Sequence, residues 1–153
     1  MYIYTNNVVS NNSLQITYAN QKLLRISFLS SPPIDFGTHT AFSELVFKEL
    51  DEYFLGQRRT FTFSYIVHGT PFQEKVWQAL CHIPYGETRS YKDIAIAIGH
   101  PSAARAVGLA NHQNPLPLVI PCHRVICADG QLGGYVGGQN LKAALLRMEA
   151  LHK

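Results

Sequence analysis

The pattern of this chain changes close to residue 69, and this change constrains the architecture more than any other feature. Before it, short β-rich runs flank one helical stripe, and after it several capped helices follow one another. The first of these begins at Thr70, Pro71 and Gln73, which supply a capping hydroxyl, a proline at the first helical position and an amide that reaches back to the cap. The sequence therefore predicts an α+β protein with two domains, residues 1–69 and 70–153.

The first of the two predicted domains has an α/β pattern. Residues 14–18 and 22–29 are β-rich and are joined by three residues that predict a hairpin. Residues 41–55 carry a largely apolar helical stripe that Gly56 can end, and residues 60–67 predict a further strand. These segments contain no constellation of reactive side chains, so we expect a supporting scaffold.

The second predicted domain contains the signals of a helix-turn-helix. Ser90 can cap a helix over residues 91–98, and Ser102 can cap the next helix through about Ala110. Two short helices joined by a turn that contains Gly99 are typical of this motif. We therefore expect a helix-turn-helix in this domain.

A glycine-rich stretch follows the predicted helix-turn-helix. An Asp-Gly pair within residues 126–135 lies between short strand-like pieces and predicts a tight hairpin, which would form a wing. Four glycines around Tyr135 and Val136 indicate a mobile or closely approached loop. Asn140 can cap a last helix that runs to about residue 151.

The helix predicted from Ser102 has one long polar side chain, Arg105, among alanines and a glycine. Small side chains fit either close packing in a core or close approach to nucleic acid, and the arginine favours nucleic acid. Residues 70–153 hold eight basic and five acidic side chains, whereas residues 1–69 hold five of each, so the net charge of +3 lies in the second domain. This modest bias permits the binding of a polyanion there.

The segment Pro121-Cys122-His123-Arg124-Val125 joins a nucleophile to a potential base. Residues 114–120 before it are apolar and proline-rich, and they would bury and fix the cysteine. The thiol is thus a candidate nucleophile, with a packing cysteine as the alternative. Neighbouring residues of a strand point to opposite faces, so we expect a bent backbone or a bridging water between the thiol and the imidazole.

The three cysteines, Cys81, Cys122 and Cys127, are an odd number without a disulfide spacing, which suits a reducing compartment. Zinc is disfavoured because there is no Cys-x-x-Cys pair, so we expect no metal. The sequence has no signal peptide and no apolar run long enough to cross a bilayer. We therefore expect a cytoplasmic protein without a membrane partner.

Several motifs occur in a fixed order along the second domain: Ser90-Tyr91, Ala103-Ala104-Arg105-Ala106-Val107-Gly108, Asn114-Pro115, Pro121-Cys122-His123-Arg124-Val125 and Gly134-Tyr135. Through these motifs the chain resembles the O6-alkylguanine-DNA alkyltransferases, the methylated-DNA-protein-cysteine methyltransferases that repair alkylated guanine directly. The resemblance is strong over residues 71–149, whereas residues 1–70 match in length and α/β pattern alone. It implies a ribonuclease H-like first domain and a winged helix-turn-helix second domain.

The resemblance also implies the reaction. Cys122 would attack the alkyl carbon on guanine O6 and keep it as a thioether, so that one protein repairs one lesion without a cofactor. A water would link Cys122 to His123, Glu149 would orient His123, Tyr91 would donate a proton toward guanine N3, and Asn114 would brace the preceding turn. Without the resemblance, Glu149 would be taken for a solvated helix charge and Tyr91 for a core aromatic.

The implied pocket and DNA surface involve further residues. The backbone carbonyls of Cys122 and Val125 would accept from the exocyclic amine of guanine, and the amide of Val136 would face O6. Many relatives carry serine in place of Val136, which leaves the tolerance of larger alkyl groups open. The remaining pocket residues are Tyr135 and Lys142, although a surface lysine is an alternative for Lys142.

The implied partner is double-stranded DNA, bound by a monomer in the minor groove with little sequence specificity. The damaged nucleotide would be flipped out, at a cost of about a few kcal/mol, and Arg105 would fill the vacated space. The expected DNA-contacting residues are Arg105, Ser102, Ala103, Ala104 and Gly108.

Two other functions remain open from the sequence. A lesion sensor of the alkyltransferase-like kind shares the fold without transferring the alkyl group, but such proteins carry another residue where this chain has Cys122. A thiol hydrolase would leave the helix-turn-helix unexplained, and no oxyanion motif is present. The sequence therefore favours the alkyltransferase.

Overall fold

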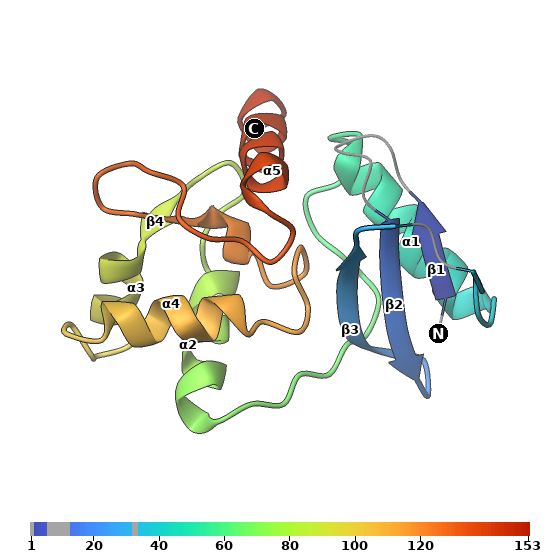
Figure 1. Cartoon of the computed structure of the whole chain (residues 1–153), viewed down its shortest axis with the longest axis horizontal. Coiled ribbons are helices and arrows are strands. Elements are labelled where there is room, and N and C mark those ends of the chain that lie inside the picture. The colour runs from blue at the N-terminus through green and yellow to red at the C-terminus, as the bar shows by residue number, and fades with distance from the viewer. Residues whose placement is uncertain (1, 6–12, 32–33) are drawn as a thin grey trace. The chain divides into compact units, whose positions relative to one another are not determined.

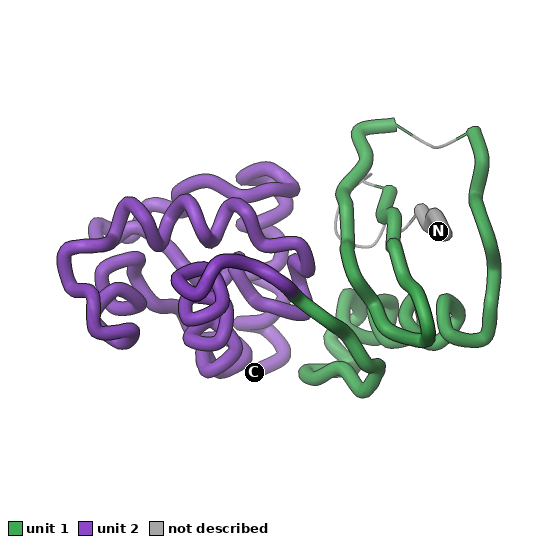
Figure 2. The backbone as a smooth tube through the Cα atoms, turned by 90° about the horizontal axis from the view of Figure 1, so that it is seen from below, with its two compact units in different colours: residues 1–67 green, residues 68–153 purple. Residues whose placement is uncertain are grey.

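The chain divides into two units, Met1–Val67 and His68–Lys153, in its computed structural model (Figure 2). The structure describes residues 2–5, 13–31 and 34–153. Each unit has buried apolar side chains of its own. The division between the units lies next to the change in sequence pattern.

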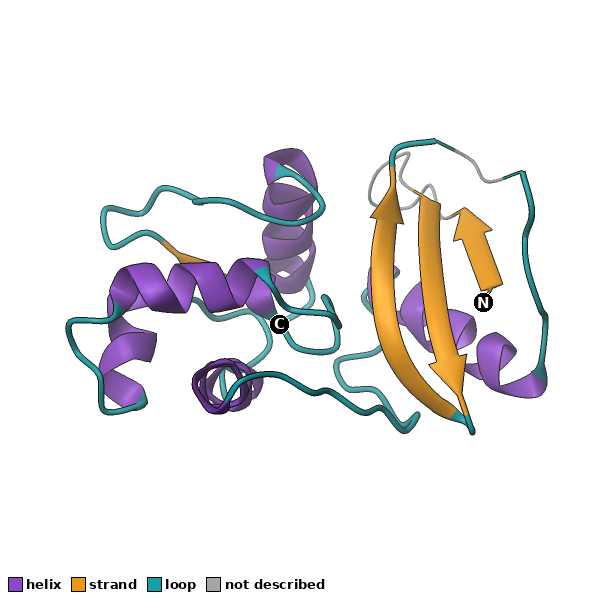
Figure 3. Ribbon diagram, turned by 60° about the horizontal axis from the view of Figure 1, so that its bottom comes forward, coloured by secondary structure: helices purple, strands orange, loops and turns teal. Residues whose placement is uncertain are grey.

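The first unit is a three-stranded antiparallel sheet with a helix on one face (Figures 1 and 3). Strands β1 (Tyr2–Thr5), β2 (Ser13–Ala19) and β3 (Lys22–Leu29) lie in the order β1-β2-β3. Helix α1 (Ala41–Phe54) begins at a capping box in which Thr40 accepts from the third helical amide. The predicted hairpin and helix are therefore confirmed.

The segment after α1 is attached to it by a buried carboxylate. Glu49 is 2% exposed and accepts hydrogen bonds from both the backbone N–H, at 2.7 Å, and the hydroxyl of Thr62. The prediction of a strand over residues 60–67 was wrong, because among the described residues this segment pairs through one bridge, between Leu23 and Tyr65. Side-chain contacts to α1 replace most of the strand pairing that the β-rich composition suggested.

Three helices pack against one another in the second unit, and a fourth follows near its end. They are α2 (Pro71–Cys81), α3 (Tyr91–Ala97), α4 (Ala104–His112) and α5 (Gln139–Leu151). The buried indole N–H of Trp77 donates to the carbonyl of Ala110 at 2.9 Å and ties α2 to the end of α4. The pair α3 and α4 occupies the predicted helix-turn-helix positions.

Local capping explains where two of these helices begin. Thr70 and Gln73 form the predicted capping box at the start of α2. Ser90 and Asp93 form another at the start of α3. These two predicted starts are confirmed.

The predicted caps of the other two helices were wrong. Helix α4 begins after Ala103, and α5 begins after Gly138, in both cases without a side-chain cap. Ser102 lies one residue before the N-cap position, and Asn140 lies inside the first turn of α5. Backbone turns start these helices instead, and the N–H of Ala103 donates to the carbonyl of His100.

The predicted wing hairpin is present as a turn without its second strand. The N–H of Gly130 donates to Cys127 O at 3.0 Å, and the N–H of Cys127 donates to Gln131 O at 2.8 Å. The strand before the turn, β5 (Val125–Ile126), pairs in parallel with β4 (Arg89–Ser90). The predicted turn is therefore present, but the prediction of two strands paired across it was wrong. Within the described ranges, no helix combines the length and apolarity needed to cross a membrane.

Candidate active site

Cys122 lies in a single 3-10 turn, η1 (Cys122–Arg124). The residue is 1% exposed, and its backbone N–H donates to the carbonyl of Ile120 at 2.7 Å. The turn replaces the strand geometry that would have sent Cys122 and His123 to opposite faces. A bent backbone is thus the arrangement adopted here.

The loop before Cys122 is held by the side chain of Asn114. Its Nδ2 donates to Ile120 O at 2.9 Å, and its Oδ1 accepts from the N–H of Leu116 at 2.9 Å. Between these contacts Leu118 has a φ of 76°, a left-handed conformation that costs a leucine about 1–2 kcal/mol. The buried amide of Asn114 therefore fixes a strained loop directly before the cysteine.

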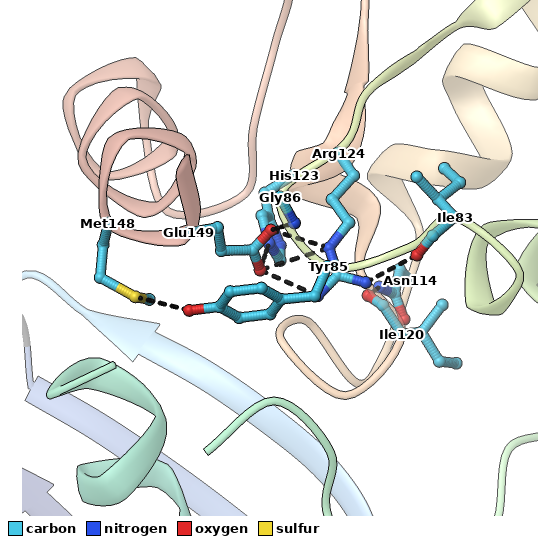
Figure 4. Close-up of polar contacts among 9 residues, drawn as sticks. All are labelled: Ile83, Tyr85, Gly86, Asn114, Ile120, His123, Arg124, Met148 and Glu149. Atoms are coloured by element: carbon cyan, nitrogen blue, oxygen red, sulfur yellow. Dashed lines mark hydrogen bonds and ion pairs between the residues drawn. The ribbon is translucent and has the colours of Figure 1, made fainter. Parts of the chain in front are cut away.

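His123 and Glu149 form a fully buried pair (Figure 4). The Nε2 atom of His123 lies 2.8 Å from Oε1 of Glu149, a residue of α5. A carboxylate accepts hydrogen bonds, so Nε2 carries the proton when the imidazole is neutral. The Nδ1 lone pair is then the position of His123 that can accept a proton.

Arg124 makes a second, bidentate contact with the same carboxylate. Its Nε lies 2.9 Å from Oε2 and its terminal nitrogen 2.9 Å from Oε1 of Glu149, while another terminal nitrogen donates to Ile83 O at 2.8 Å (Figure 4). The N–H of Gly86 also donates to Glu149 at 3.2 Å. Two segments far apart in sequence are therefore joined at Glu149.

These contacts set the protonation states of the buried pair. Burial alone would raise the pKa of Glu149, but the hydrogen bonds from His123 and Arg124 outweigh it and hold that pKa well below its usual range. Burial lowers the pKa of His123, and the hydrogen bond to Glu149 offsets this only in part. At neutral pH the pair is therefore a carboxylate and a neutral imidazole.

The thiol of Cys122 is mostly protonated in this environment. Burial raises its pKa to about 11, against smaller opposing contributions from Asn114 and Lys142. At pH 7.4 fewer than about one thiol in a thousand is then ionised. Nucleophilic attack by Cys122 therefore requires a proton acceptor.

Lys142 is a fully buried lysine that holds two backbone carbonyls. Its Nζ donates to Val125 O at 2.6 Å and to Gly134 O at 3.2 Å. Burial lowers the pKa of this ammonium group. Lys142 thus links α5 to the turn after Cys122 and to the glycine-rich loop, and it is not a surface lysine.

A cavity of about 280 Å³ lies beside α4. We call it the Tyr91 cavity; it is lined by Tyr91, Gly108, Asn111, His112, Cys127, Gly133, Gly134, Tyr135 and Val136. Two of these lining residues contact the turn that contains Cys122. Asn111 donates to the Cys122 carbonyl, and the ring of Tyr135 packs edge-on against that of His123 with centroids 6.4 Å apart. The cavity lining and the turn that carries Cys122 are therefore joined through these two residues.

Tyr91 enters this cavity from the first position of α3, and Gly133 makes room for it. A Cβ atom at Gly133 would lie 2.9 Å from the Tyr91 hydroxyl, and the φ of Gly133 is 72°. Both observations require glycine at this position. The glycine-rich loop thus closes tightly over the phenol.

The residues predicted to contact DNA lie at or near the start of α4. Arg105 and Ser102 are exposed, whereas Ala103, Ala104 and Gly108 are partly exposed. They present one arginine among small side chains, and Gly108 also lines the Tyr91 cavity. The predicted DNA-contacting residues and the cavity therefore meet at Gly108 of α4.

The structure brings the predicted catalytic and pocket residues together around η1, α5 and the Tyr91 cavity. Sequence reasoning missed Arg124 as a partner of Glu149 and Asn111 as a partner of the Cys122 carbonyl. Arg124 belongs to the segment 121–125 that the sequence indicated because of its cysteine. Its partners Glu149 and Ile83 lie 25 and 41 positions away, so no local sequence pattern indicated these contacts. Among the described residues, no group of three or more His, Cys, Asp or Glu side chains could hold a metal ion.

Comparisons with known proteins show the family to which this chain is similar. Residues 71–151 match the family model described as 6-O-methylguanine DNA methyltransferase, DNA binding domain. A methylated-DNA–protein-cysteine methyltransferase of Methanosarcina barkeri is 50% identical over 117 residues, which are 76% of this chain and 74% of the relative. One from Mycobacterium leprae is 57% identical over 109 residues, which are 71% of this chain and 66% of the relative.

The fold is also similar to that of solved structures. Mycobacterium tuberculosis OGT in complex with DNA superimposes with a TM-score of 0.86 at 42% identity, covering 99% of this chain and 94% of that one. An O6-methylguanine DNA methyltransferase from Methanococcus jannaschii gives a TM-score of 0.69 at 28% identity, covering 92% and 89%. The similarity therefore extends over both units.

Proposed function

The chain belongs to the 6-O-methylguanine DNA methyltransferase family, and from this premise we propose that it repairs DNA by moving the alkyl group of O6-alkylguanine irreversibly to its own Cys122. It is thus a methylated-DNA–protein-cysteine methyltransferase that acts once. The observation that carries this proposal is the buried thiol of Cys122, followed directly in the chain by a buried His123 whose Nε2 is held by the Glu149 carboxylate.

The thiol loses its proton to His123. Because Glu149 keeps the proton of His123 on Nε2, the Nδ1 atom accepts the thiol proton, through a bridging water. Glu149 then faces an imidazolium, which it stabilises as an ion pair. Arg124 keeps Glu149 charged and in place throughout.

The thiolate sulfur forms a bond to the alkyl carbon as the bond from that carbon to guanine O6 breaks. The electron pair of the broken bond stays on the guanine, and a proton from the Tyr91 hydroxyl neutralises the ring at N3. The proton that His123 took from the thiol then passes through solvent to Tyr91, so that both side chains end neutral. The backbone amide of Val136 stabilises the developing charge on O6. The resulting thioether has no leaving group that water could displace easily, so the protein is consumed.

The damaged nucleotide reaches the thiol by rotating out of the duplex into the Tyr91 cavity. Arg105 extends from the exposed face of α4 and occupies the space that the nucleotide leaves. The small side chains of Ala103 and Ala104 allow this helix to approach the minor groove. Binding is monomeric, rests on backbone contacts and has little sequence specificity.

The two units have separate roles in this proposal. Residues 1–69 form a ribonuclease H-like scaffold, supported by the three-stranded sheet with α1 on one face. Residues 70–153 form a winged helix-turn-helix alkyltransferase domain, supported by the pair α3 and α4 and the turn after β5. The protein works in the cytoplasm on double-stranded DNA.

A titration tests the proposed function. A duplex that contains O6-methylguanine is mixed in excess with the protein, and the lesions that disappear are counted by base composition. We expect a plateau at one lesion per protein. Continued turnover would contradict the single-use mechanism, and tight binding without loss of the lesion would indicate a lesion sensor.

A further inference from the structure

Asn111 connects α4, to which it belongs, with the turn that contains Cys122. It is the penultimate residue of α4, is 4% exposed, and donates from Nδ2 to the carbonyl of Cys122 at 3.2 Å. A carbonyl oxygen accepts hydrogen bonds and cannot donate them, so this contact fixes which end of the amide faces Cys122. The Oδ1 atom of Asn111 is therefore directed elsewhere.

This Oδ1 atom is buried and has no hydrogen-bond partner within the part of the chain that the structure describes. An unsatisfied buried acceptor costs free energy comparable to a lost hydrogen bond, so such atoms are rare in folded proteins. Asn111 also lines the Tyr91 cavity. An acceptor in this position suits a donor that arrives with a ligand.

The chemistry of the proposed substrate narrows the identity of that donor. Alkylation at O6 removes the N1 proton of guanine, so N1 becomes an acceptor, as O6, N3 and N7 already are, and N9 is bonded to the sugar. The 2-amino group is then the one N–H donor left on the base. An acceptor such as Oδ1 of Asn111 can therefore accept a hydrogen bond from this exocyclic amino group, and no nitrogen of the ring offers it an N–H.

We propose that Asn111 is a specificity residue whose Oδ1 accepts a hydrogen bond from the 2-amino group of the flipped O6-alkylguanine. This inference rests on the proposed function and adds a residue to it. The carbonyls of Cys122 and Val125 already accept from Asn111 and Lys142, at 3.2 and 2.6 Å, and each retains a second lone pair. Both carbonyls can therefore still accept from the amine, and Oδ1 of Asn111 shares the N–H that is directed at the carbonyl of Cys122.

The proposal gives the amide of Asn111 two simultaneous contacts. One end holds the backbone of the nucleophile, and the other end holds the base that the nucleophile attacks. The reacting carbon and sulfur are thereby placed through a single rigid group. Bases that lack the 2-amino group would leave Oδ1 unsatisfied in the complex.

The test compares duplexes that contain O6-methylguanine with duplexes that contain O6-methylhypoxanthine, which lacks the 2-amino group. The wild-type protein should react about tenfold or more faster with O6-methylguanine, because a buried polar group left unpaired penalises the analogue. In Asn111→Leu this preference should shrink by about fivefold or more. The loss should fall mainly on O6-methylguanine.

The ratio of the two rates is measured within each protein, so a partly active preparation does not affect it. Asn111→Ala gives the same comparison if the leucine variant does not fold, and Gln113→Leu, an exposed neighbour, should keep the wild-type ratio. An unchanged ratio in the Asn111 variants, or equal slowing on both duplexes, would overturn the inference. Failure of the wild-type protein to react with O6-methylguanine would instead overturn the proposed function.

Discussion

The Nε2 atom of His123 lies 2.8 Å from Oε1 of Glu149, and neither side chain is exposed to solvent. This contact leaves Nδ1 as the basic atom of His123, while burial lowers the pKa of the imidazole and raises that of the Cys122 thiol to about 11. Over the range of pH between these two pKa values the thiol is protonated and the imidazole is neutral, so the thiol proton can pass to the imidazole. The rate of alkyl transfer should reflect this proton transfer.

We expect the wild-type rate to be nearly level from about pH 7 to about pH 10, because both the neutral imidazole and the protonated thiol persist there. In His123→Asn no base takes the proton, so the rate should rise about tenfold per pH unit toward the thiol pKa. The measurement is the second-order rate with free O6-benzylguanine at fixed ionic strength. A level profile in the variant would show that His123 is not the acceptor.

Glu149→Gln should destabilise the fold, because Arg124 would then be a buried cation without its partner. Breaking a buried pair in this way costs about 3–5 kcal/mol, measured as the free energy of unfolding in urea at pH 7. Glu87→Gln is the matched control, because its ion pair with Arg89 is exposed and should contribute about 0–1 kcal/mol. Equal effects of the two substitutions would contradict this account of Glu149.

The same carboxylate should also make the stability depend on pH. Its pKa is lowered in the folded state, so its contribution is fully present above the unfolded pKa, about 4.5, and is lost as the pH falls below that value. Glu149→Gln should therefore lose less stability than the wild-type protein between about pH 5 and about pH 3. Parallel stability curves over this range would count against the lowered pKa.

Arg105→Ala should separate DNA repair from the chemistry at Cys122. We expect repair of O6-methylguanine in duplex DNA to fall by at least about tenfold, because the flipped nucleotide loses the side chain that replaces it in the stack. Reaction with free O6-benzylguanine should stay close to the wild-type rate. Arg147→Ala, which removes an exposed arginine from α5, is the control. Equal losses on both substrates in the Arg105 variant would refute the flipping role.

Gly133→Ala should slow reaction even with a free base. A methyl group there would lie 2.9 Å from the Tyr91 hydroxyl, and the left-handed backbone would be strained by about 1–2 kcal/mol. We expect the rate with O6-benzylguanine to fall by about tenfold or more as Tyr91 is displaced. Gly99→Ala carries the same left-handed strain, introduces no contact within 4 Å and does not line the Tyr91 cavity, so it should keep the wild-type rate. A normal rate in Gly133→Ala would argue against close packing of Tyr91 by this loop.

Local chemistry explains what the sequence could predict about the fold. The boxes at Thr70 and Ser90 each act over three residues, so the starts of α2 and α3 were visible in the sequence. The starts of α4 and α5 lack side-chain caps, and Ser102 and Asn140 drew the prediction toward residues that do not cap. Capping patterns predict a helix start only where the backbone presents the side chain to the helix.

Contacts between distant segments explain what the sequence could not show. Residues 60–67 have the composition of a strand, but the Glu49 carboxylate on α1 fixes this segment instead. Arg124 and Asn111 became recognisable only when their partners, Glu149 and the carbonyl of Cys122, were brought close by the fold. The nucleophile was visible in the sequence, and the resemblance pointed to Asn114 and Glu149, whereas the contacts of Arg124 and Asn111 were not visible.

The intact mass of the protein after reaction with an O6-methylguanine duplex tests the central claim most directly. We predict a gain of about 14 Da, one CH₂ group, located on Cys122 by peptide mapping and absent in Cys122→Ser. Cys127, which lines the Tyr91 cavity, should remain unmodified. An unchanged mass, or methylation at a residue other than Cys122, would contradict the account.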